Sequence, residues 1–339
     1  VRGWYHGRYR ALRSARAQEL LTTLMPALLQ AIADTANPNA TLGRFDRFLS
    51  NLPTGVQLFS MLKARPQLLE LLAEIMGSAP RLANYLAENS SVVDAMTSAE
   101  FLAAPPALTA LRREFAEDLD AALDLQDILD FTRRRVKERK FQIGVQILGA
   151  TIDADRSGAG YADLADAALG SLLPSVGEAF ATAERHGRID GGTMVVLAMG
   201  KFGSREMTGE SDLDLIFVYD YPDDDSISDG ERPLPAQQYF TRLSQRLINA
   251  LTVPTAEGKL YEVDMRLRPS GNSGPVATRF SGFADYQRNE AWTWEHMALT
   301  RARVVAGGAE LAARVEGTIA EVLRRPRKRQ ATAADVSAM

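Results

Sequence analysis

The chain of 339 residues is long enough for about two domains, and its hydrophobic and charged fractions, 46% and 24%, are those of an ordinary globular protein. It contains no cysteine and only three histidines, which excludes disulfides and thiolate sites and argues against a multi-histidine zinc centre. A formal net charge of −4 argues against broad binding to nucleic acid or to an anionic membrane, and no apolar run reaches the ~18 residues of a membrane span.

These exclusions leave carboxylates, hydroxyls, backbone amides and bound metal as the sources of any chemistry. We therefore predict a cytoplasmic protein that does not bind nucleic acid or membranes. Because the chain begins at Val1 without a charged-then-apolar leader, we also expect it to be a fragment of a longer protein.

The first third of the chain has the period of α-helices. Apolar residues recur every fourth position from Leu20 to Ile32, and similar faces begin at Val56 and Leu68. Gly77 is expected to end the third of these helices, and the next is expected to begin near position 80. We predict that residues 1–115 form a helical linker or regulatory region.

A longer helical stretch is predicted from position 108 to 152, without a glycine before Gly144. It carries six basic residues between Arg133 and Lys140. They wrap the helix rather than line one stripe, which favours a solvated surface over a docking or phosphate-facing one. A glycine-containing loop, 153–160, is expected next, and a further helix should end at His186–Gly187.

The period changes after position 192. Residues 193–199 and 213–219 are short apolar runs that predict buried strands, and 260–267 predicts a third strand. An amphipathic helix is expected at 239–251.

The polar, glycine- and proline-rich segments 221–233 and 268–277 are predicted as loops. Residues 280–323 are predicted to be helical. The predicted fold class is α+β, with a small mixed β-sheet embedded in a predominantly α-helical protein. Its catalytic domain with flanking helices would occupy 116–323, and 324–339 would be a basic linker to a further helical region.

Two aspartates open the second predicted strand. Side chains at positions i and i+2 of a strand point to the same side, so Asp212 and Asp214 can share one cation. Adjacent carboxylates repel each other, and Mg²⁺, which prefers carboxylate and phosphate oxygens, relieves that repulsion. The preceding turn, Gly203–Ser204, offers amides and a hydroxyl suited to a phosphate. It is not a Walker A loop, because Phe202 stands where that loop has Ser or Thr.

A third carboxylate is expected on the neighbouring strand. If 260–267 is extended, Glu262, Asp264, Arg266 and Arg268 share one face. Asp264 can then complete a metal site, while the two arginines can neutralise a polyphosphate. The alternative is that these are exposed residues of an edge strand.

The spacing of Gly203–Ser204, Asp212, Asp214 and a distal Asp264 resembles the DNA polymerase β-like nucleotidyltransferase superfamily. Three stretches, 200–217, 264–274 and 284–303, are similar to the bacterial glutamine synthetase adenylyltransferases, bifunctional enzymes with two such domains. Residues 289–296 resemble the C-terminal, adenylylating copy. The resemblance therefore implies the central region plus that domain, with a nucleotidyltransferase-type sheet.

The implied activity is transfer of AMP from ATP to a tyrosine hydroxyl of glutamine synthetase, with release of pyrophosphate, to down-regulate nitrogen assimilation. The resemblance implies two Mg²⁺ ions held by Asp212, Asp214 and Asp264. It also implies glutamine synthetase as protein substrate, and the PII signalling protein and glutamine as regulators. The implied nucleotide-binding residues are Gly203, Ser204, Arg205, Arg266 and Arg268.

Three other readings stay open. The domain could be the adenylyl-removing, phosphorolytic copy of the same enzyme, or a non-catalytic interaction module. A template-independent nucleic-acid nucleotidyltransferase is disfavoured by the negative net charge. Trp292 and Trp294 could stack on adenine, but two residues at i and i+2 of a helix cannot face one ligand together, which favours core packing for both.

Overall fold

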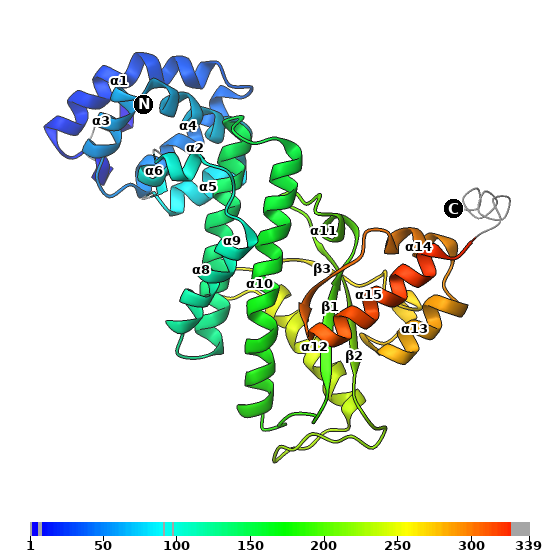
Figure 1. Ribbon diagram of the computed structural model, residues 1–339. Coiled ribbons are helices and arrows are strands. Elements are labelled where there is room, and N and C mark those ends of the chain that lie inside the picture. Colours follow the sequence, from blue (N-terminus) through cyan, green and yellow to red (C-terminus); the bar gives the residue numbers. More distant parts are fainter. Residues whose placement is uncertain (1, 6–8, 91, 97, 327–339) are drawn as a thin grey trace. The chain divides into compact units, whose positions relative to one another are not determined.

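The computed structural model describes residues 2–5, 9–90, 92–96 and 98–326 (Figure 1). It divides into two compact units, one of residues 1–105 and 139–156 and one of residues 106–138 and 157–339. Most of the predicted basic linker, from position 327 on, lies outside the described residues. The predicted domain boundaries stay a prediction. None of the helices in the described ranges is long and apolar enough to cross a membrane.

The first unit is a bundle of short helices. Proline stands at the first turn of α2, α4 and α5, where its fixed φ and missing N–H cost nothing. Gly77 lies inside α4, which ends one residue later than predicted, and the helix expected near position 80 is α5. The helices are α1 Ala15–Ala33, α2 Pro38–Asn51, α3 Val56–Ala64, α4 Pro66–Ser78, α5 Pro80–Glu88, α6 Val92–Ala95 and α7 Ala99–Leu102.

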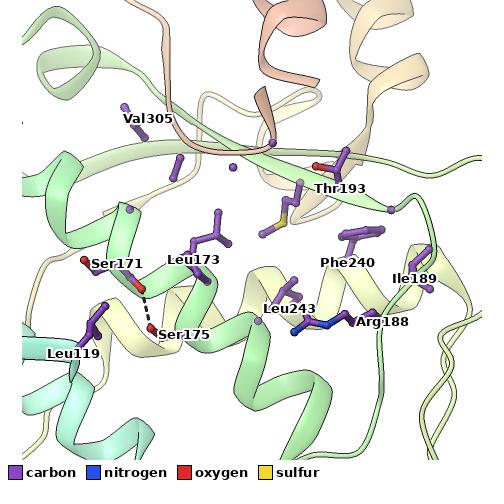
Figure 2. A pocket seen from close by; sticks show the side chains of 18 of the residues that line it. Leu119, Ser171, Leu173, Ser175, Arg188, Ile189, Thr193, Phe240, Leu243 and Val305 are labelled. Carbon is purple, nitrogen blue, oxygen red and sulfur yellow. Dashed lines mark hydrogen bonds between the residues drawn. The ribbon is translucent and has the colours of Figure 1, made fainter. Parts of the chain in front are cut away.

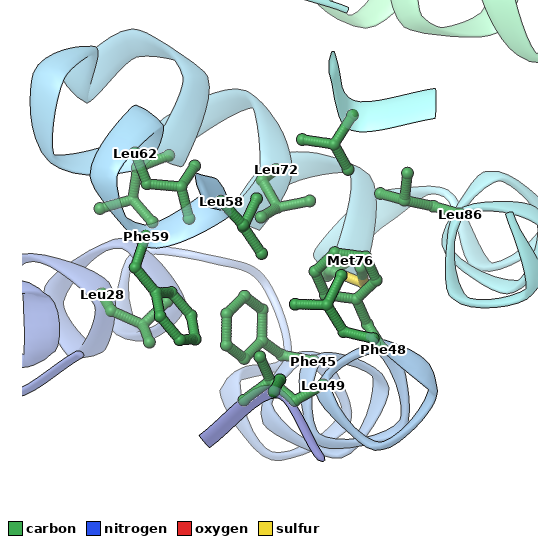
Figure 3. Close-up of a cluster of buried hydrophobic side chains, with 14 of the residues drawn as sticks. Leu28, Phe45, Phe48, Leu49, Leu58, Phe59, Leu62, Leu72, Met76 and Leu86 are labelled. Atoms are coloured by element: carbon green, nitrogen blue, oxygen red, sulfur yellow. The ribbon is translucent and has the colours of Figure 1, made fainter. Parts of the chain in front are cut away.

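Aromatic and aliphatic side chains of these helices form the core of the first unit (Figure 3). Phe45 and Phe48 of α2 and Phe59 of α3 are at most 1% exposed. Burying a side chain of this size contributes about 1.5–3 kcal/mol. The predicted faces that run from Leu20 to Ile32 and from Leu68 onward are buried in this core, whereas Phe45 and Phe48 lie on a helix for which no apolar face was predicted.

The stretch predicted as one long helix is two helices, α8 Leu108–Asp120 and α9 Leu125–Leu148. The carboxylate of Asp124 accepts from the backbone N–H of Asp127 at 2.9 Å, which begins a new helix after the break. Gly144 does not end α9. A Cβ at this position would lie 2.9 Å from the side chain of Leu82, so the glycine permits a close approach between helices.

The loop predicted at 153–160 is wrong, because α10 Ala154–Thr182 begins there. The carboxylate of Asp153 accepts from the N–H of Arg156 at 2.8 Å at the start of this helix. Gly158 lies inside it, and a Cβ there would lie 3.0 Å from the carbonyl oxygen of Arg205. Gly158 thus permits a close approach of the Arg205 main chain to α10 and does not form a turn.

A mixed sheet forms the centre of the second unit, as predicted, but it has five strands rather than the three expected from the sequence. The strand order is β3-β2-β1-β5, with β4 also paired to β2. β1 is antiparallel to β2 and β5, whereas β3 and β4 are parallel to β2. The strands are β1 Thr193–Ala198, β2 Leu213–Asp220, β3 Val263–Asp264, β4 Ala277–Arg279 and β5 Arg303–Gly307.

The third predicted strand, 260–267, is wrong except at Val263 and Asp264, which form β3. After Asp264 the chain turns back, because the N–H of Arg266 donates to the Asp264 carboxylate at 2.8 Å and the N–H of Arg268 donates to the carbonyl of Met265 at 3.2 Å. The shared face proposed for Glu262, Asp264 and the two arginines therefore does not form. The prediction of a helical stretch at 280–323 is also wrong in part, because residues 303–307 form the strand β5.

Helices cover both faces of the sheet (Figure 1). Val195, Leu197 and Val218 pack with side chains of α13, α14 and α15 in one core cluster. On the other face, Tyr219 stacks on Phe240 of α12 at 4.9 Å between ring centroids. The remaining helices are α11 Gly200–Ser204, α12 Ala236–Thr252, α13 Phe280–Asn289, α14 Thr293–Leu299 and α15 Ala309–Arg324.

The two tryptophans at the start of α14 are not core residues, contrary to the sequence-based prediction. Trp292 is 71% exposed and Trp294 is 39% exposed. The buried position of this turn is taken instead by Glu295, whose carboxylate accepts from the Tyr286 hydroxyl at 2.7 Å and from the N–H of Trp292 at 2.8 Å. The turn is thus fixed by a polar side chain, and the indoles point outward.

Candidate active site

The three predicted carboxylates meet at one edge of the sheet. Asp214 is the second residue of β2 and Asp264 the second of β3, and the parallel register sets them opposite each other. Asp212 lies just before β2. Each contributes a carboxylate oxygen to a group whose members all lie within 4.8 Å of one another. In the described part of the chain this is the one cluster of three or more such side chains that could hold a metal ion.

The electrostatics of the cluster favour a cation. Burial raises the pKa of Asp214, and the charges of Asp212 and Asp264 raise it further. The positive charges of Arg266 and Lys201 lower the pKa of the same carboxyl. A divalent cation would remove the repulsion, and an all-oxygen donor set is the one that Mg²⁺ prefers. The residues present therefore fit this metal.

Arg266 is the positive side chain that contacts the cluster. Its Nε donates to one oxygen of the Asp264 carboxylate at 2.7 Å, and its main-chain N–H donates to the other oxygen at 2.8 Å. These hydrogen bonds lower the pKa of Asp264. The Arg266 side chain is otherwise open to solvent, with 75% of it exposed.

Gly200 leaves room for the Asp214 carboxylate, a role that sequence reasoning missed. Its φ is +54°, and a Cβ built there would lie 2.1 Å from the nearer Asp214 oxygen. Only glycine combines that backbone conformation with so close an approach. The available signal was a glycine directly between a buried strand and a short helix. The preceding N–H, of Met199, donates to the main-chain carbonyl of Asp214 at 2.9 Å.

We expect Gly200→Ala to lower the free energy of unfolding by about 1–3 kcal/mol, because Ala is strained at positive φ and its methyl group displaces the carboxylate. Urea denaturation measures this. Gly170→Ala in α10 is the matched control, since a Cβ there meets no atom within 4 Å, and it should be neutral or stabilising by up to about 1 kcal/mol. Equal effects of the two substitutions would contradict the assignment.

The predicted turn, Gly203–Ser204, lies within the short helix α11. The N–H of Gly203 donates to the Met199 carbonyl at 2.8 Å, and a Cβ there would lie 1.8 Å from the carbonyl oxygen of Arg301. The Ser204 hydroxyl lies 3.1 Å from the Gly200 carbonyl and 2.9 Å from the Glu206 carboxylate. Both residues thus have partners within the protein, and their role in binding phosphate stays a prediction.

The other two predicted arginines are engaged elsewhere. Arg205 forms an ion pair with Asp163 of α10 at 2.8 Å. Arg268 donates to the main-chain carbonyl of Met265 at 2.7 Å and so closes the turn after β3. Of the predicted nucleotide-binding arginines, Arg266 is the one whose hydrogen bonds reach the aspartate cluster.

An ion pair between a partly exposed arginine and a buried aspartate contacts α11. Arg303 of β5 donates to both oxygens of Asp166 of α10, at 2.6 and 2.9 Å. The same guanidinium donates to the main-chain carbonyls of Phe202 and Gly203, each at 3.2 Å. It therefore joins α10, α11 and β5.

A separate cavity of about 880 Å³ lies between α10, α12 and the neighbouring ends of β1 and β5 (Figure 2). Leu173, Met194 and Leu243 form part of its apolar wall, and the Ser175 hydroxyl facing it donates to the Ser171 carbonyl at 2.9 Å. None of the predicted site residues lines it. The cavity and the aspartate cluster are therefore different places in this unit.

Comparison with known proteins identifies the family of this chain. A profile of the glutamate-ammonia ligase adenylyltransferase family matches residues 69–318. The chain belongs to this family. The family predicted from the sequence is thereby confirmed, and the α+β class with its mixed sheet is confirmed by the structure.

Several relatives match along the whole chain. The chain is 48% identical over 339 residues to the bifunctional glutamine synthetase adenylyltransferase/adenylyl-removing enzyme of Brucella suis. It is 48% identical over 342 residues to the enzyme of that name from Mesorhizobium japonicum, and 47% identical over 336 residues to that from Agrobacterium fabrum. In each case at least 99% of this chain aligns with 34% of the relative. The chain thus spans about a third of the length of these relatives.

Proposed function

We propose that the second unit transfers AMP from ATP to a tyrosine hydroxyl of glutamine synthetase and releases pyrophosphate, and so down-regulates nitrogen assimilation. The observation that carries the proposal is the cluster of Asp212, Asp214 and Asp264 at the edge of the sheet in a member of this family. The printed names of the relatives support the choice of protein substrate.

Asp212, Asp214 and Asp264 are the residues that would hold two Mg²⁺ ions. When bound, such ions polarise the phosphate and make a hydroxyl a better nucleophile at neutral pH. Because Gly200 has no side chain, it leaves room for the Asp214 carboxylate. Because Arg266 lowers the pKa of Asp264, this carboxylate is a weak base, which favours a role as ligand over a role as proton acceptor.

The positive side chains beside the cluster fit a polyphosphate. Arg266 is exposed and carries a planar guanidinium suited to phosphate oxygens. Lys201 acts electrostatically on Asp214 and offers a second cation. We propose that these two offset the charge on the leaving pyrophosphate. Roles for Gly203, Ser204, Arg205 and Arg268 stay predictions.

The same site suits removal of AMP, in which inorganic phosphate attacks the phosphorus of the tyrosine–AMP ester. The bond between that phosphorus and the tyrosine oxygen then breaks, so ADP forms and the tyrosine hydroxyl is regenerated. The similarity of residues 289–296 to the adenylylating copy favours transfer over removal. A non-catalytic role for the second unit is disfavoured, because its carboxylate cluster is complete. For the helical unit we propose a regulatory role that responds to the PII protein and glutamine, and a cytoplasmic location stays a prediction.

The deciding experiment incubates the chain with glutamine synthetase, Mg²⁺ and ATP labelled at the α-phosphate. We expect label on glutamine synthetase, and none with Asp214→Asn. In parallel, adenylylated glutamine synthetase is incubated with phosphate. Release of ADP there, without labelling in the first reaction, would support the removing copy. If the folded protein carries out neither reaction, a catalytic role is contradicted.

A further inference from the structure

Arg133 of α9 is a buried arginine that the sequence had placed on a solvated surface. It is 1% exposed. Its Nε donates to the carbonyl of Gly258 at 2.7 Å, and its Nη2 donates to those of Ala250 and Val253, both at 2.8 Å. A further bond reaches Leu129 of its own helix at 2.9 Å. Its partners in the described structure are thus main-chain carbonyls rather than a carboxylate.

Arginine has the donors that this position needs. Ala250 and Val253 lie at the C-terminal end of α12, where carbonyls lack helical partners and the helix dipole favours a positive charge. The guanidinium fork reaches this helix end and the Gly258 turn at once, which a lysine with one nitrogen cannot do. Burial lowers the pKa of Arg133, so the side chain is held against a desolvation cost.

Neighbours of Arg133 on α9 hold the same turn, residues 253–258. The Thr255 hydroxyl donates to the Asp130 carboxylate. Lys137 lies 3.5 Å from the Glu257 carboxylate. Positions 130, 133 and 137 repeat at the spacing of one helix face. This face of α9 therefore contacts the turn through three side chains, at positions 130, 133 and 137.

The turn leads directly to Asp264. After Gly258, the N–H of Tyr261 donates to the Leu251 carbonyl at 3.0 Å. The Glu262 carbonyl accepts from the N–H of Leu213 at 2.9 Å. β3 then consists of Val263 and Asp264 alone. A strand of two residues has little pairing of its own, so its position depends on the segment that precedes it.

We propose that Arg133 is a positioning residue for Asp264: it fixes the 253–258 turn so that the Asp264 carboxylate meets Asp212 and Asp214. The inference rests on the proposed function for its catalytic consequence. Its structural consequence is independent of catalysis, because cation binding by the three carboxylates can be measured without any reaction.

The test compares Arg133→Lys with Arg135→Lys in the full chain. Arg135 is the matched control, since it lies on the same helix but pairs with Asp118 at 2.9 Å, away from the turn. Mn²⁺, which also takes carboxylate ligands, serves as the probe, and its affinity is measured by calorimetry or electron paramagnetic resonance. We expect Arg133→Lys to weaken Mn²⁺ binding by about 10–100-fold, as removal of outer support for metal ligands does. Arg135→Lys should leave it within about twofold of the parent.

A double-mutant cycle with Asp264→Asn separates positioning from a general effect on folding. If Arg133 acts through Asp264, adding Arg133→Lys to Asp264→Asn should cause no further loss of Mn²⁺ affinity or of AMP transfer. A multiplicative further loss would overturn the proposal, as would parental Mn²⁺ affinity in Arg133→Lys. Circular dichroism verifies folding, and if Arg133→Lys does not fold, Thr255→Val is used and should weaken Mn²⁺ binding in the same direction.

The two proposals fail in different ways. Parental protein that binds Mn²⁺ but transfers no AMP would contradict the proposed function, while the effect of Arg133→Lys on Mn²⁺ would still decide the positioning role. Parental protein that binds no Mn²⁺ would overturn the positioning role.

Discussion

Replacing Asp214 by Asn should lower the rate of AMP transfer by about three orders of magnitude. The substitution removes the central carboxylate of the cluster, and the charge stabilisation that a metal site gives a phosphoryl transfer is worth several kcal/mol, or about tenfold per 1.4 kcal/mol. Asp212→Asn should have a comparable effect. The measurement is the initial rate of label transfer from α-labelled ATP at saturating Mg²⁺.

The same substitution should not destabilise the metal-free protein. Burial and two neighbouring carboxylates disfavour the charged form of Asp214, so a neutral amide relieves repulsion. We expect an unchanged or higher unfolding midpoint in EDTA. Asp225→Asn, at an exposed loop position, is the control and should retain parental activity. Near-normal transfer by Asp214→Asn would contradict the proposed metal site.

Replacing Arg303 by Met should lower the free energy of unfolding by about 3–5 kcal/mol, because it leaves the Asp166 carboxylate buried without its partner. Asp166 is 2% exposed. A domain with 5–15 kcal/mol of total stability would lose a large part of it. AMP transfer should fall as well, since the carbonyls of Phe202 and Gly203 lose their donor and α11 carries part of the site. Urea denaturation measures the first effect.

The loss in Arg303→Met should shrink as the pH falls. Burial raises the pKa of Asp166, and Arg303 counteracts that rise. Without Arg303 the folded-state pKa rises further above the unfolded value, so the folded protein binds the extra proton and gains stability as the pH drops through that raised pKa. The double variant Arg303→Met with Asp166→Leu should regain much of the stability at neutral pH. A loss that is independent of pH and not rescued would contradict this account.

Local patterns were sufficient for much of the fold. Helices α1, α3 and α4 and the strands β1 and β2 follow from apolar spacing, which depends on neighbours along the chain. Two failures arose where a glycine was taken as a terminator. Gly77 and Gly158 lie inside helices, and each permits close contact with a residue far away in the sequence. β5 was missed because it pairs with β1 only through the tertiary fold.

The three aspartates were named from the sequence, but for partly wrong reasons. The predicted strand at 260–267 would have set Asp264 on one face with both arginines. The structure keeps Asp264 beside Asp214 through a two-residue strand and turns the following residues back. Arg266 still reaches the cluster, whereas Arg268 closes a turn.

The sequence by itself determined which residue types are available: carboxylates at i and i+2, a distal aspartate, and no cysteine for a thiolate site. Those features are local or compositional, so they do not require the fold. Only the tertiary structure decided that Asp264 lies opposite Asp214, that Arg133 points inward to main-chain carbonyls, and that two tryptophans face solvent. These outcomes depend on contacts between distant segments, and the free energy of such contacts overrides what the spacing of a single segment favours.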